Sequence, residues 1–182
     1  MSRIILIGGG VRSGKSAFAL RLAMQHAGTR AFVATAEARD AEMRARIARH
    51  VTERGDRFVT VEAPRELEYT MTRLNKRAEV VVIDCLTLWL SNLILDGVEE
   101  RELDTRVQAL TTILHAAPFA SIVVTNEVGM GIVPESVLGR RFRDVAGRAH
   151  QTIARRSSRI YLAALGVILR LRPGPVEVEE PA

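Results

Sequence analysis

The sequence predicts an α/β fold in which helices cover both faces of a mostly parallel sheet, with an antiparallel hairpin at one edge. Apolar segments of strand length alternate along the chain with segments of helical periodicity, which is typical of strand–helix units around a parallel sheet. The first apolar segment, residues 4–7, leads into the glycine-rich run of residues 9–16 and then into a helix. Strand, glycine-rich turn and helix in this order favour a phosphate-binding loop of the Walker A type.

The other elements follow from apolar periodicity and from residues that cap or break helices. Strands are expected at 31–36, 58–62, 80–84 and 121–127, and helices at 40–54, 65–77, 86–95 and 101–116, with a last helix that starts at about 134 or 138 and ends at 157. Asp40 has the residue type of a helix N-cap. Segments 160–163 and 167–171 flank Gly166 and predict the edge hairpin. We expect residues 1–172 to form a single nucleotide-binding domain and the Pro- and Glu-rich residues 173–182 to form a flexible tail.

Composition excludes several classes of protein. A chain of 182 residues can bury a full core as one domain. No apolar run is long enough to cross a bilayer, and no secretory signal is recognisable. The net charge of +5 suggests an anionic partner, but the arginines are mixed with acids and aromatic residues make up only 4%, so no nucleic-acid partner is expected. Cys85 is the only cysteine, which excludes an intrachain disulfide and fits the reducing cytoplasm.

The residue types of the glycine-rich run match the chemistry of phosphate binding. Gly9, Gly10 and Gly14 are expected to let the backbone curl so that its N–H groups point at phosphate oxygens, where a Cβ atom would obstruct the curl. The helix that follows adds the partial positive charge of its N-terminus. Lys15 is expected to reach the terminal phosphates, and the Ser16 hydroxyl is expected to bind Mg²⁺.

Polar residues at the ends of the other strands extend this site. Ligands of parallel sheets bind beyond the carboxyl ends of the strands, which places Thr35, Glu62, Asp84 and the pair Asn126-Glu127 along one rim. Asp84 ends an apolar strand, as a Walker B acid does, and is expected to help hold Mg²⁺ or orient an attacking hydroxyl. The alternatives are a capping or solvated acid for Asp84, and a purely structural role for Glu127.

His50 is the most informative residue outside the loop. Met43, Ile47, His50 and Arg54 are spaced to share one helix face, so His50 lies on the apolar stripe. A histidine on such a stripe is more often a packing residue, but a neutral imidazole is also a competent nucleophile towards phosphorus. A metal-ligand role is disfavoured because partners at ligand spacing are lacking. The other histidines are expected to be structural: His26, His115 and His150.

Four blocks of the sequence resemble the bifunctional adenosylcobinamide kinase/adenosylcobinamide-phosphate guanylyltransferase family of cobalamin biosynthesis. They are residues 9–16, 34–50, 84–87 and 125–134, the last of which continues into 139–147. The resemblance spans most of residues 4–171, and the block from Thr125 is its most specific part. The chain departs from the family pattern at His150, where the family usually has Asn, and at Phe58, where Trp is common.

The resemblance implies a RecA-like P-loop fold, a homotrimer and two reactions. A nucleoside triphosphate, ATP or GTP, first phosphorylates the aminopropanol hydroxyl of adenosylcobinamide. His50 then attacks the α-phosphate of GTP, and adenosylcobinamide phosphate takes the GMP from the guanylyl-histidine, giving adenosylcobinamide-GDP and pyrophosphate. Catalytic roles are implied for His50, Lys15, Ser16 and Asp84, with Mg²⁺ held by Ser16 and Asp84.

Binding residues are implied in three groups. The phosphates are assigned to the loop: Gly9, Gly10, Val11, Arg12, Ser13, Gly14, Lys15 and Ser16. The nucleoside is assigned to the following strands and helix: Ala34, Thr35, Ala36, Val51, Thr52, Glu53, Arg54, Glu62 and Asp84. Asn126 and Glu127 are candidate contacts of the acceptor. Two alternatives remain open at this stage, a P-loop kinase of another small hydroxyl compound without the histidine intermediate and a non-catalytic nucleotide-binding switch.

Overall fold

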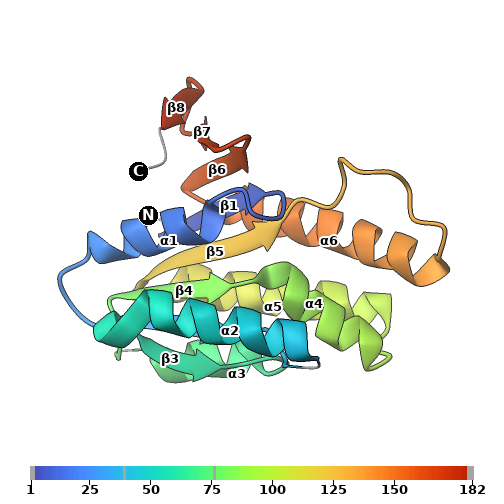
Figure 1. Ribbon diagram of the computed structural model, residues 1–182, viewed down its shortest axis with the longest axis horizontal. Helices are drawn as coiled ribbons and strands as arrows, with labels where there is room; N and C mark the ends of the chain where they lie inside the picture. The colour runs from blue at the N-terminus through green and yellow to red at the C-terminus, as the bar shows by residue number, and fades with distance from the viewer. Residues whose placement is uncertain (1–2, 39, 76, 180–182) are drawn as a thin grey trace.

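One eight-stranded sheet forms the centre of the molecule (Figure 1). The structure, a computed structural model, describes residues 3–38, 40–75 and 77–179; the side chains at positions 42, 46, 49, 50, 53 and 177–179 are outside this description. The strands are β1 (Ile4–Gly9), β2 (Arg30–Ala34), β3 (Val59–Glu62), β4 (Val80–Asp84), β5 (Ala120–Asn126), β6 (Arg159–Ala164), β7 (Val167–Arg172) and β8 (Glu177–Glu179). The helices are α1 (Lys15–Met24), α2 (Ala41–Arg54), α3 (Leu67–Leu74), α4 (Leu86–Leu95), α5 (Glu100–Ala116) and α6 (Val137–Arg156), with a 3-10 turn, η1 (Gly55–Arg57), after α2.

The sheet is parallel over most of its width, as the sequence predicts. Its strand order is β3-β2-β4-β5-β1-β6-β7-β8. The first six strands pair in parallel, whereas β6, β7 and β8 pair antiparallel. The expected hairpin at the edge is therefore present, as β6 and β7.

The last strand differs from the expectation of a flexible tail. Residues 177–179 form β8 and pair with residues 168–170 of β7. The composition of the tail shows that it has few side chains to bury, but it does not reveal the open edge of β7, whose unpaired backbone groups a short strand can satisfy.

Helices cover both faces of the sheet with separate apolar cores. On one face Phe18 and Leu22 of α1 pack against Ile5 and Ile7 of β1. On the other face α3, α4, α5 and α6 bury a larger cluster around Trp89, which is fully buried. Figure 1 shows α2 in front of the sheet at β4 and α5 behind it. Among the described residues, no helix combines the length and apolar character needed to cross a bilayer.

Local signals explain where the helices begin and end. The Asp40 carboxylate accepts a hydrogen bond from the backbone N–H of Met43 at 2.7 Å, so it caps α2 as predicted. Helix α3 begins later than expected because the carbonyl of Arg65 accepts hydrogen bonds from the Trp89 and Arg106 side chains, outside the helix, and it also ends earlier, at Leu74.

Strand register brings the four central strand ends to one edge. Gly9 of β1 lies opposite Asn126 of β5, and Asp84 of β4 lies between Val124 of β5 and Ala34 of β2. Because β5 is inserted between β1 and β4, Asn126 stands between the glycine-rich loop and Asp84.

Candidate active site

The glycine-rich loop has the backbone that phosphate binding requires, at two of its three expected positions. Gly14 has φ +90° and caps α1, a conformation that L side chains rarely adopt. Gly9 has φ +157°, and a Cβ there would lie 2.5 Å from the carbonyl oxygen of Ala163 in β6. At Gly10 no protein atom lies within 4 Å of the Cβ that would be added, so its role beside a phosphate stays a prediction.

The loop directs its polar groups inwards. Lys15 is buried, and its Nζ atom donates a hydrogen bond to the carbonyl of Gly10 at 2.8 Å. No side chain caps the N-terminus of α1 among the described residues, so the first N–H groups of that helix face outwards to the loop. The Ser13 hydroxyl is also buried without a hydrogen-bond partner in the described part of the chain. These donors and the helix terminus are groups of the kind that bind anions.

A buried network fixes the end of β4. The Thr35 hydroxyl donates to the Cys85 carbonyl at 2.8 Å and accepts from the Cys85 N–H at 2.7 Å. The Asn92 amide donates to the carbonyls of Thr35 and Pro64. Burial raises the pKa of the Cys85 thiol to about 11, with the negative charge of Asp84 acting in the same direction. Asp84, one residue earlier, is thereby held at the edge of the sheet.

Asn126 and Glu127 point to opposite faces, as neighbours in a strand do. Asn126 lies on the α1 side, where its amide donates to the Thr87 hydroxyl at 3.2 Å. Glu127 lies on the α6 side, 3.7 Å from Nδ1 of His150. Nε2 of His150 is 2.7 Å from the Thr125 hydroxyl, and burial lowers the pKa of His150 while Glu127 partly opposes that effect. Asn126 is therefore the one of the pair that faces the loop.

A cleft of about 110 Å³ joins the loop, the strand ends and α2. Its lining residues are Val11, Lys15, Ser16, Phe32, Ala34, Ala36, Met43, Ile47, Arg54, Asp84, Cys85, Leu88 and Asn126. The guanidinium of Arg54 lies 3.7 Å from the centre of the Phe32 ring, a cation–π contact. Met43, Ile47 and Arg54 show that the inner face of α2 closes one side of the cleft.

Several other predicted residues do not line the cleft. Thr35 is buried beneath it, whereas Glu62 is exposed at the end of β3. Val51 and Thr52 are exposed on α2, and the Thr52 hydroxyl bonds the carbonyl of Ala48 within the helix. The side chains of His50 and Glu53 lie outside the described part of the structure, so their roles stay predictions.

Five lining residues were not predicted as site residues; of these, Met43 and Ile47 were expected only on the inward stripe of the helix, and Phe32, Cys85 and Leu88 were not expected near the site. Phe32 reads as an ordinary core position of a buried strand, and Leu88 as one of many leucines in an apolar helix. A signal existed only for Cys85, which directly follows the Walker B acid.

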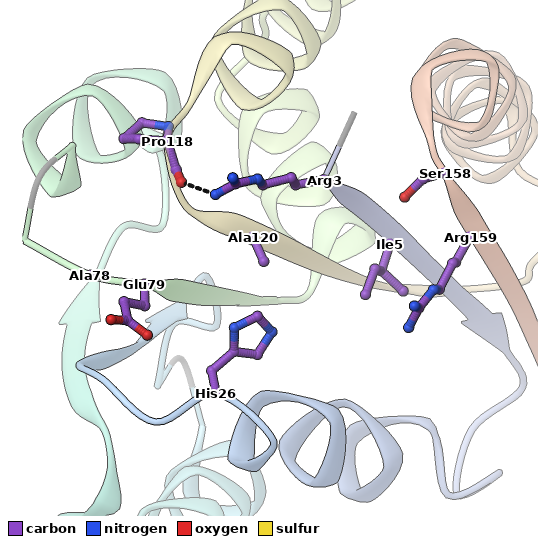
Figure 2. A pocket seen from close by; sticks show the side chains of 9 residues that line it. All are labelled: Arg3, Ile5, His26, Ala78, Glu79, Pro118, Ala120, Ser158 and Arg159. Atoms are coloured by element: carbon purple, nitrogen blue, oxygen red, sulfur yellow. Dashed lines mark hydrogen bonds between the residues drawn. The ribbon is translucent and has the colours of Figure 1, made fainter. Parts of the chain in front are cut away.

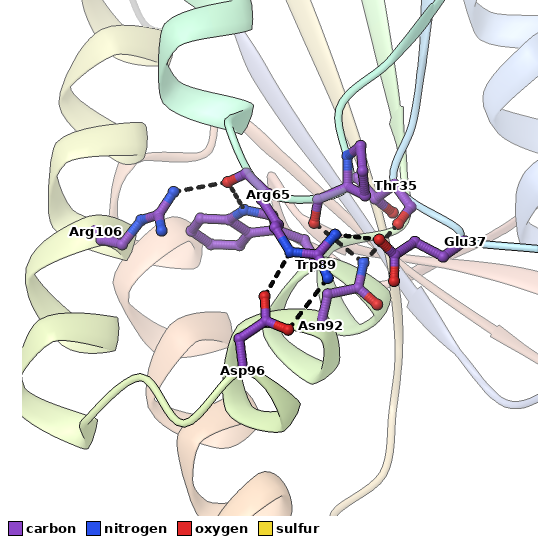
Figure 3. Close-up of polar contacts among 8 residues, drawn as sticks. Thr35, Glu37, Arg65, Trp89, Asn92, Asp96 and Arg106 are labelled. Atoms are coloured by element: carbon purple, nitrogen blue, oxygen red, sulfur yellow. Dashed lines mark hydrogen bonds and ion pairs between the residues drawn. The ribbon is translucent and has the colours of Figure 1, made fainter. Parts of the chain in front are cut away.

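Ion pairs link the loops that connect strands and helices near the cleft (Figure 3). Arg65 pairs with Glu37, which follows β2, and with Asp96, which ends α4, at 2.5 Å. These two carboxylates raise the pKa of the Arg65 guanidinium above its ordinary value. Arg106 of α5 pairs with Glu68 at 2.7 Å and donates to the carbonyl of Arg65. These contacts thus join the β2–α2, β3–α3 and α4–α5 connections close to the segment that leads into α2.

A second cavity, of about 520 Å³, lies at the opposite edge of the sheet, where the strands begin. Figure 2 shows Arg3, His26, Glu79 and Arg159 around it. Arg3 donates to the carbonyl of Pro118, and Glu79 accepts from the N–H of Gly28. None of the predicted site residues lines this larger cavity.

Comparison with known proteins identifies relatives over nearly the whole chain. Residues 5–171 match the family model described as cobinamide kinase / cobinamide phosphate guanyltransferase. The bifunctional adenosylcobalamin biosynthesis protein CobP of Pseudomonas aeruginosa is 41% identical over 171 residues, which cover 94% of this chain and 98% of that protein. The bifunctional adenosylcobalamin biosynthesis protein CobU of Escherichia coli is 34% identical over 181 residues, covering 93% and 99%.

Solved structures with lower sequence identity share the fold alone. The flagellar accessory protein FlaH from Methanocaldococcus jannaschii has a TM-score of 0.54 and 16% identity, with 97% of this chain and 84% of that chain covered. The RadB recombinase has a TM-score of 0.50 and 19% identity, with 96% and 85% covered. These neighbours confirm the RecA-like P-loop arrangement.

Proposed function

Because the chain belongs to the cobinamide kinase/cobinamide phosphate guanyltransferase family, we propose that it performs two successive transfers on one acceptor. ATP or GTP first gives its γ-phosphate to the aminopropanol hydroxyl of adenosylcobinamide. GTP then gives GMP to adenosylcobinamide phosphate, which yields adenosylcobinamide-GDP and pyrophosphate. The observation that carries this proposal is the cleft in which Lys15, Ser16 and Asp84 meet the inner face of α2.

The loop of residues 9–16 binds the triphosphate in this proposal. Backbone N–H groups and the N-terminus of α1 provide donors and positive potential for phosphate oxygens. The Lys15 ammonium, which now bonds the carbonyl of Gly10, would exchange that neutral partner for the charged β- and γ-phosphates. A charge-assisted bond is stronger than one to a carbonyl, so the exchange favours nucleotide binding.

Ser16 and Asp84 supply a donor set that fits Mg²⁺. A hydroxyl and a carboxylate both line the cleft, and Mg²⁺ is commonly held by one or two protein oxygens together with phosphates and water. Among the described residues no group of three or more His, Cys, Asp or Glu could hold a metal, which agrees with a site that relies on the nucleotide for its remaining ligands. The ion would supply charge neutralisation for the phosphates.

His50 is the proposed nucleophile of the second transfer. It follows Ile47 by three residues and precedes Arg54 by four, and both of these line the cleft from α2. A ring nitrogen would attack the α-phosphorus of GTP, forming a P–N bond as the P–O bond to pyrophosphate breaks. An acceptor phosphate oxygen would then break the P–N bond and take the GMP, which regenerates the imidazole.

The same cleft is proposed to hold the nucleoside. Arg54, stacked on Phe32, offers a planar cation to the base or the ribose. We assign further contacts by their positions in the chain: Ala34, Thr35, Ala36, Val51, Thr52, Glu53 and Glu62. Asn126 faces the loop and is proposed to contact the reacting groups of the acceptor, whereas Glu127 would act from the α6 side.

We further propose that the enzyme works as a homotrimer in the cytoplasm and has no nucleic-acid partner. The single cysteine and the mixed distribution of charges support this setting. Sedimentation equilibrium of the purified chain tests the trimer, because a mass of one or two chains would contradict it.

The experiment that tests the mechanism is incubation with α-³²P-GTP and Mg²⁺. Label is expected to stay on denatured wild-type protein, to be released by acid, and to be absent from His50→Ala. His26→Ala is the matched control because His26 lies at the opposite edge of the sheet, and it should keep the label.

Other outcomes assign a different reaction. If wild-type protein transfers γ-phosphate to cobinamide but never takes α-label, the chain is a kinase without a histidine intermediate. If both His50→Ala and His26→Ala keep the label, another residue is the nucleophile.

A further inference from the structure

The connection between β5 and α6 presents a concentrated apolar surface. We call residues 128–138 the apolar arm. Its exposed side chains include Met130 (80% exposed), Ile132 (97%) and Val137 (73%), with Val133 and Leu138 also exposed. A contiguous set of large apolar side chains in water marks a binding surface more often than a single exposed one does.

The arm is held at both ends. At its beginning Oε1 of Glu127 accepts a hydrogen bond from the N–H of Gly129 at 2.6 Å. At its end Arg140 donates to the carbonyls of Pro134 and Glu135, and Ser136 caps α6. The exposed side chains therefore project from a fixed base.

The apolar arm starts at the nucleotide cleft. It begins two residues after Asn126, which lines the cleft, and the N–H of Glu127, the residue between them, donates to the carbonyl of Gly9 in the loop at 3.0 Å. Val11, 68% exposed, adds another apolar side chain at the mouth of the cleft. Figure 1 shows this connection running outwards from the tip of β5 beside the loop that follows β1.

The chemistry of the acceptor fits this surface. The corrin ring of cobinamide is far broader than the cleft of about 110 Å³ that is proposed to hold the nucleotide, so the ring must stay outside while the aminopropanol arm reaches the phosphates. That ring has broad apolar faces and a neutral rim of amides, and Glu135 is the only charged residue of the apolar arm. A largely apolar surface that begins beside the phosphate-binding loop is what such a ring requires.

We propose that the apolar arm binds the corrin ring of the acceptor and so directs its hydroxyl, and later its phosphate, into the cleft. The inference rests on the proposed function for the identity of the acceptor. It adds the surface that selects a corrinoid over smaller alcohols.

The test compares two double variants. Met130→Ser/Ile132→Ser removes two exposed side chains of the arm, and Leu165→Ser/Val176→Ser removes two other exposed apolar side chains, from the β6–β7 turn and the segment before β8. Binding of dicyanocobinamide is measured by equilibrium dialysis from corrinoid absorbance. The arm variant should bind at least about tenfold more weakly, which corresponds to the burial of one apolar side chain, and the control should bind like wild type.

A second readout separates this inference from the proposed function. Protein labelling by α-³²P-GTP should be the same in wild type, arm variant and control, because the arm is not needed for the attack on GTP. Absence of label from wild type would contradict the guanylyl intermediate and leave the dialysis result as the test of the arm.

Two outcomes would overturn the assignment. Equal corrinoid binding by the arm variant and wild type would show that the ring binds elsewhere. A lower sedimentation coefficient of the arm variant alone would assign the arm to a contact between copies of the chain.

Discussion

His150 joins α6 to the end of β5 through two side chains. It lies 2.7 Å from the Thr125 hydroxyl and 3.7 Å from the Glu127 carboxylate. The neutral ring suits this buried place, because burial lowers the pKa of His150 below its ordinary value of 6.5. Protonation of the ring is therefore less favourable in the folded protein than in the unfolded chain.

This position predicts a pH-dependent stability. Above pH 6.5 the ring is neutral in both the folded and the unfolded chain, so the shift has no effect on unfolding. As the pH falls below that value, the unfolded chain binds the proton first and the free energy of unfolding decreases, by at most about 1.4 kcal/mol per pH unit for one proton. The free energy of unfolding, measured in urea between pH 7.5 and 5, should therefore decrease less for His150→Asn than for wild type.

The control for this prediction is His115→Asn, since His115 is exposed on α5. It should keep the pH dependence of the wild type. Equal slopes for wild type and His150→Asn would show that the ring already titrates as in the unfolded chain.

At the scale of elements, α2 depends on a single cap. The bond from the Met43 N–H to the Asp40 carboxylate fixes the first turn of the helix that closes the cleft. Asp40→Ala should destabilise that turn by about 1 kcal/mol, which raises its opening about fivefold. Hydrogen exchange of the first-turn amides should rise accordingly, and the rate of protein guanylylation should fall.

Asp40→Asn is the matched variant for the cap. Asn accepts the same hydrogen bond, so it should exchange and react like wild type. If Ala and Asn behave alike, the negative charge rather than the cap matters at this position.

Elements with a strong local pattern were predictable from the sequence. The β-branched run of β4, the apolar helix α4 with bounds 86–95, and the cap at Asp40 all match, because local propensity and tertiary packing agree there. The start of α3 and the presence of β8 were not predictable. Both depend on partners far away in the chain, namely Trp89 and Arg106 for the Arg65 carbonyl and the open edge of β7 for residues 177–179.

The candidate site shows the same division. The loop and Asp84 follow from residue types, and the lining by Met43, Ile47 and Arg54 agrees with the predicted stripe of α2. The contact of Arg54 with Phe32 did not follow, since no local pattern marks Phe32 as different from its neighbours in β2.

At the scale of the whole molecule, the single thiol reports on global unfolding. Cys85 is 3% exposed and lies in the core between the sheet and α1. Although Cys85 also lines the cleft, its low exposure means that Ellman's reagent should react only as fast as the chain unfolds. GTP with Mg²⁺ at a hundred times its Kd should slow the reaction about a hundredfold, because it binds the folded state alone.

Rapid reaction of the native protein would contradict this prediction and show that the cleft admits the reagent. Cys85→Ser provides the blank, as it removes the only thiol of the chain.

The insertion of β5 between β1 and β4 has a consequence for nucleotide selection by charge. At the tip of β5 an amide faces the loop and a carboxylate faces α6, one residue apart. A shift of a single residue in that strand would turn every side chain to the other face and place Glu127 where anionic substrates must enter. The register of β5 thus decides whether a neutral amide or a negatively charged carboxylate faces the glycine-rich loop.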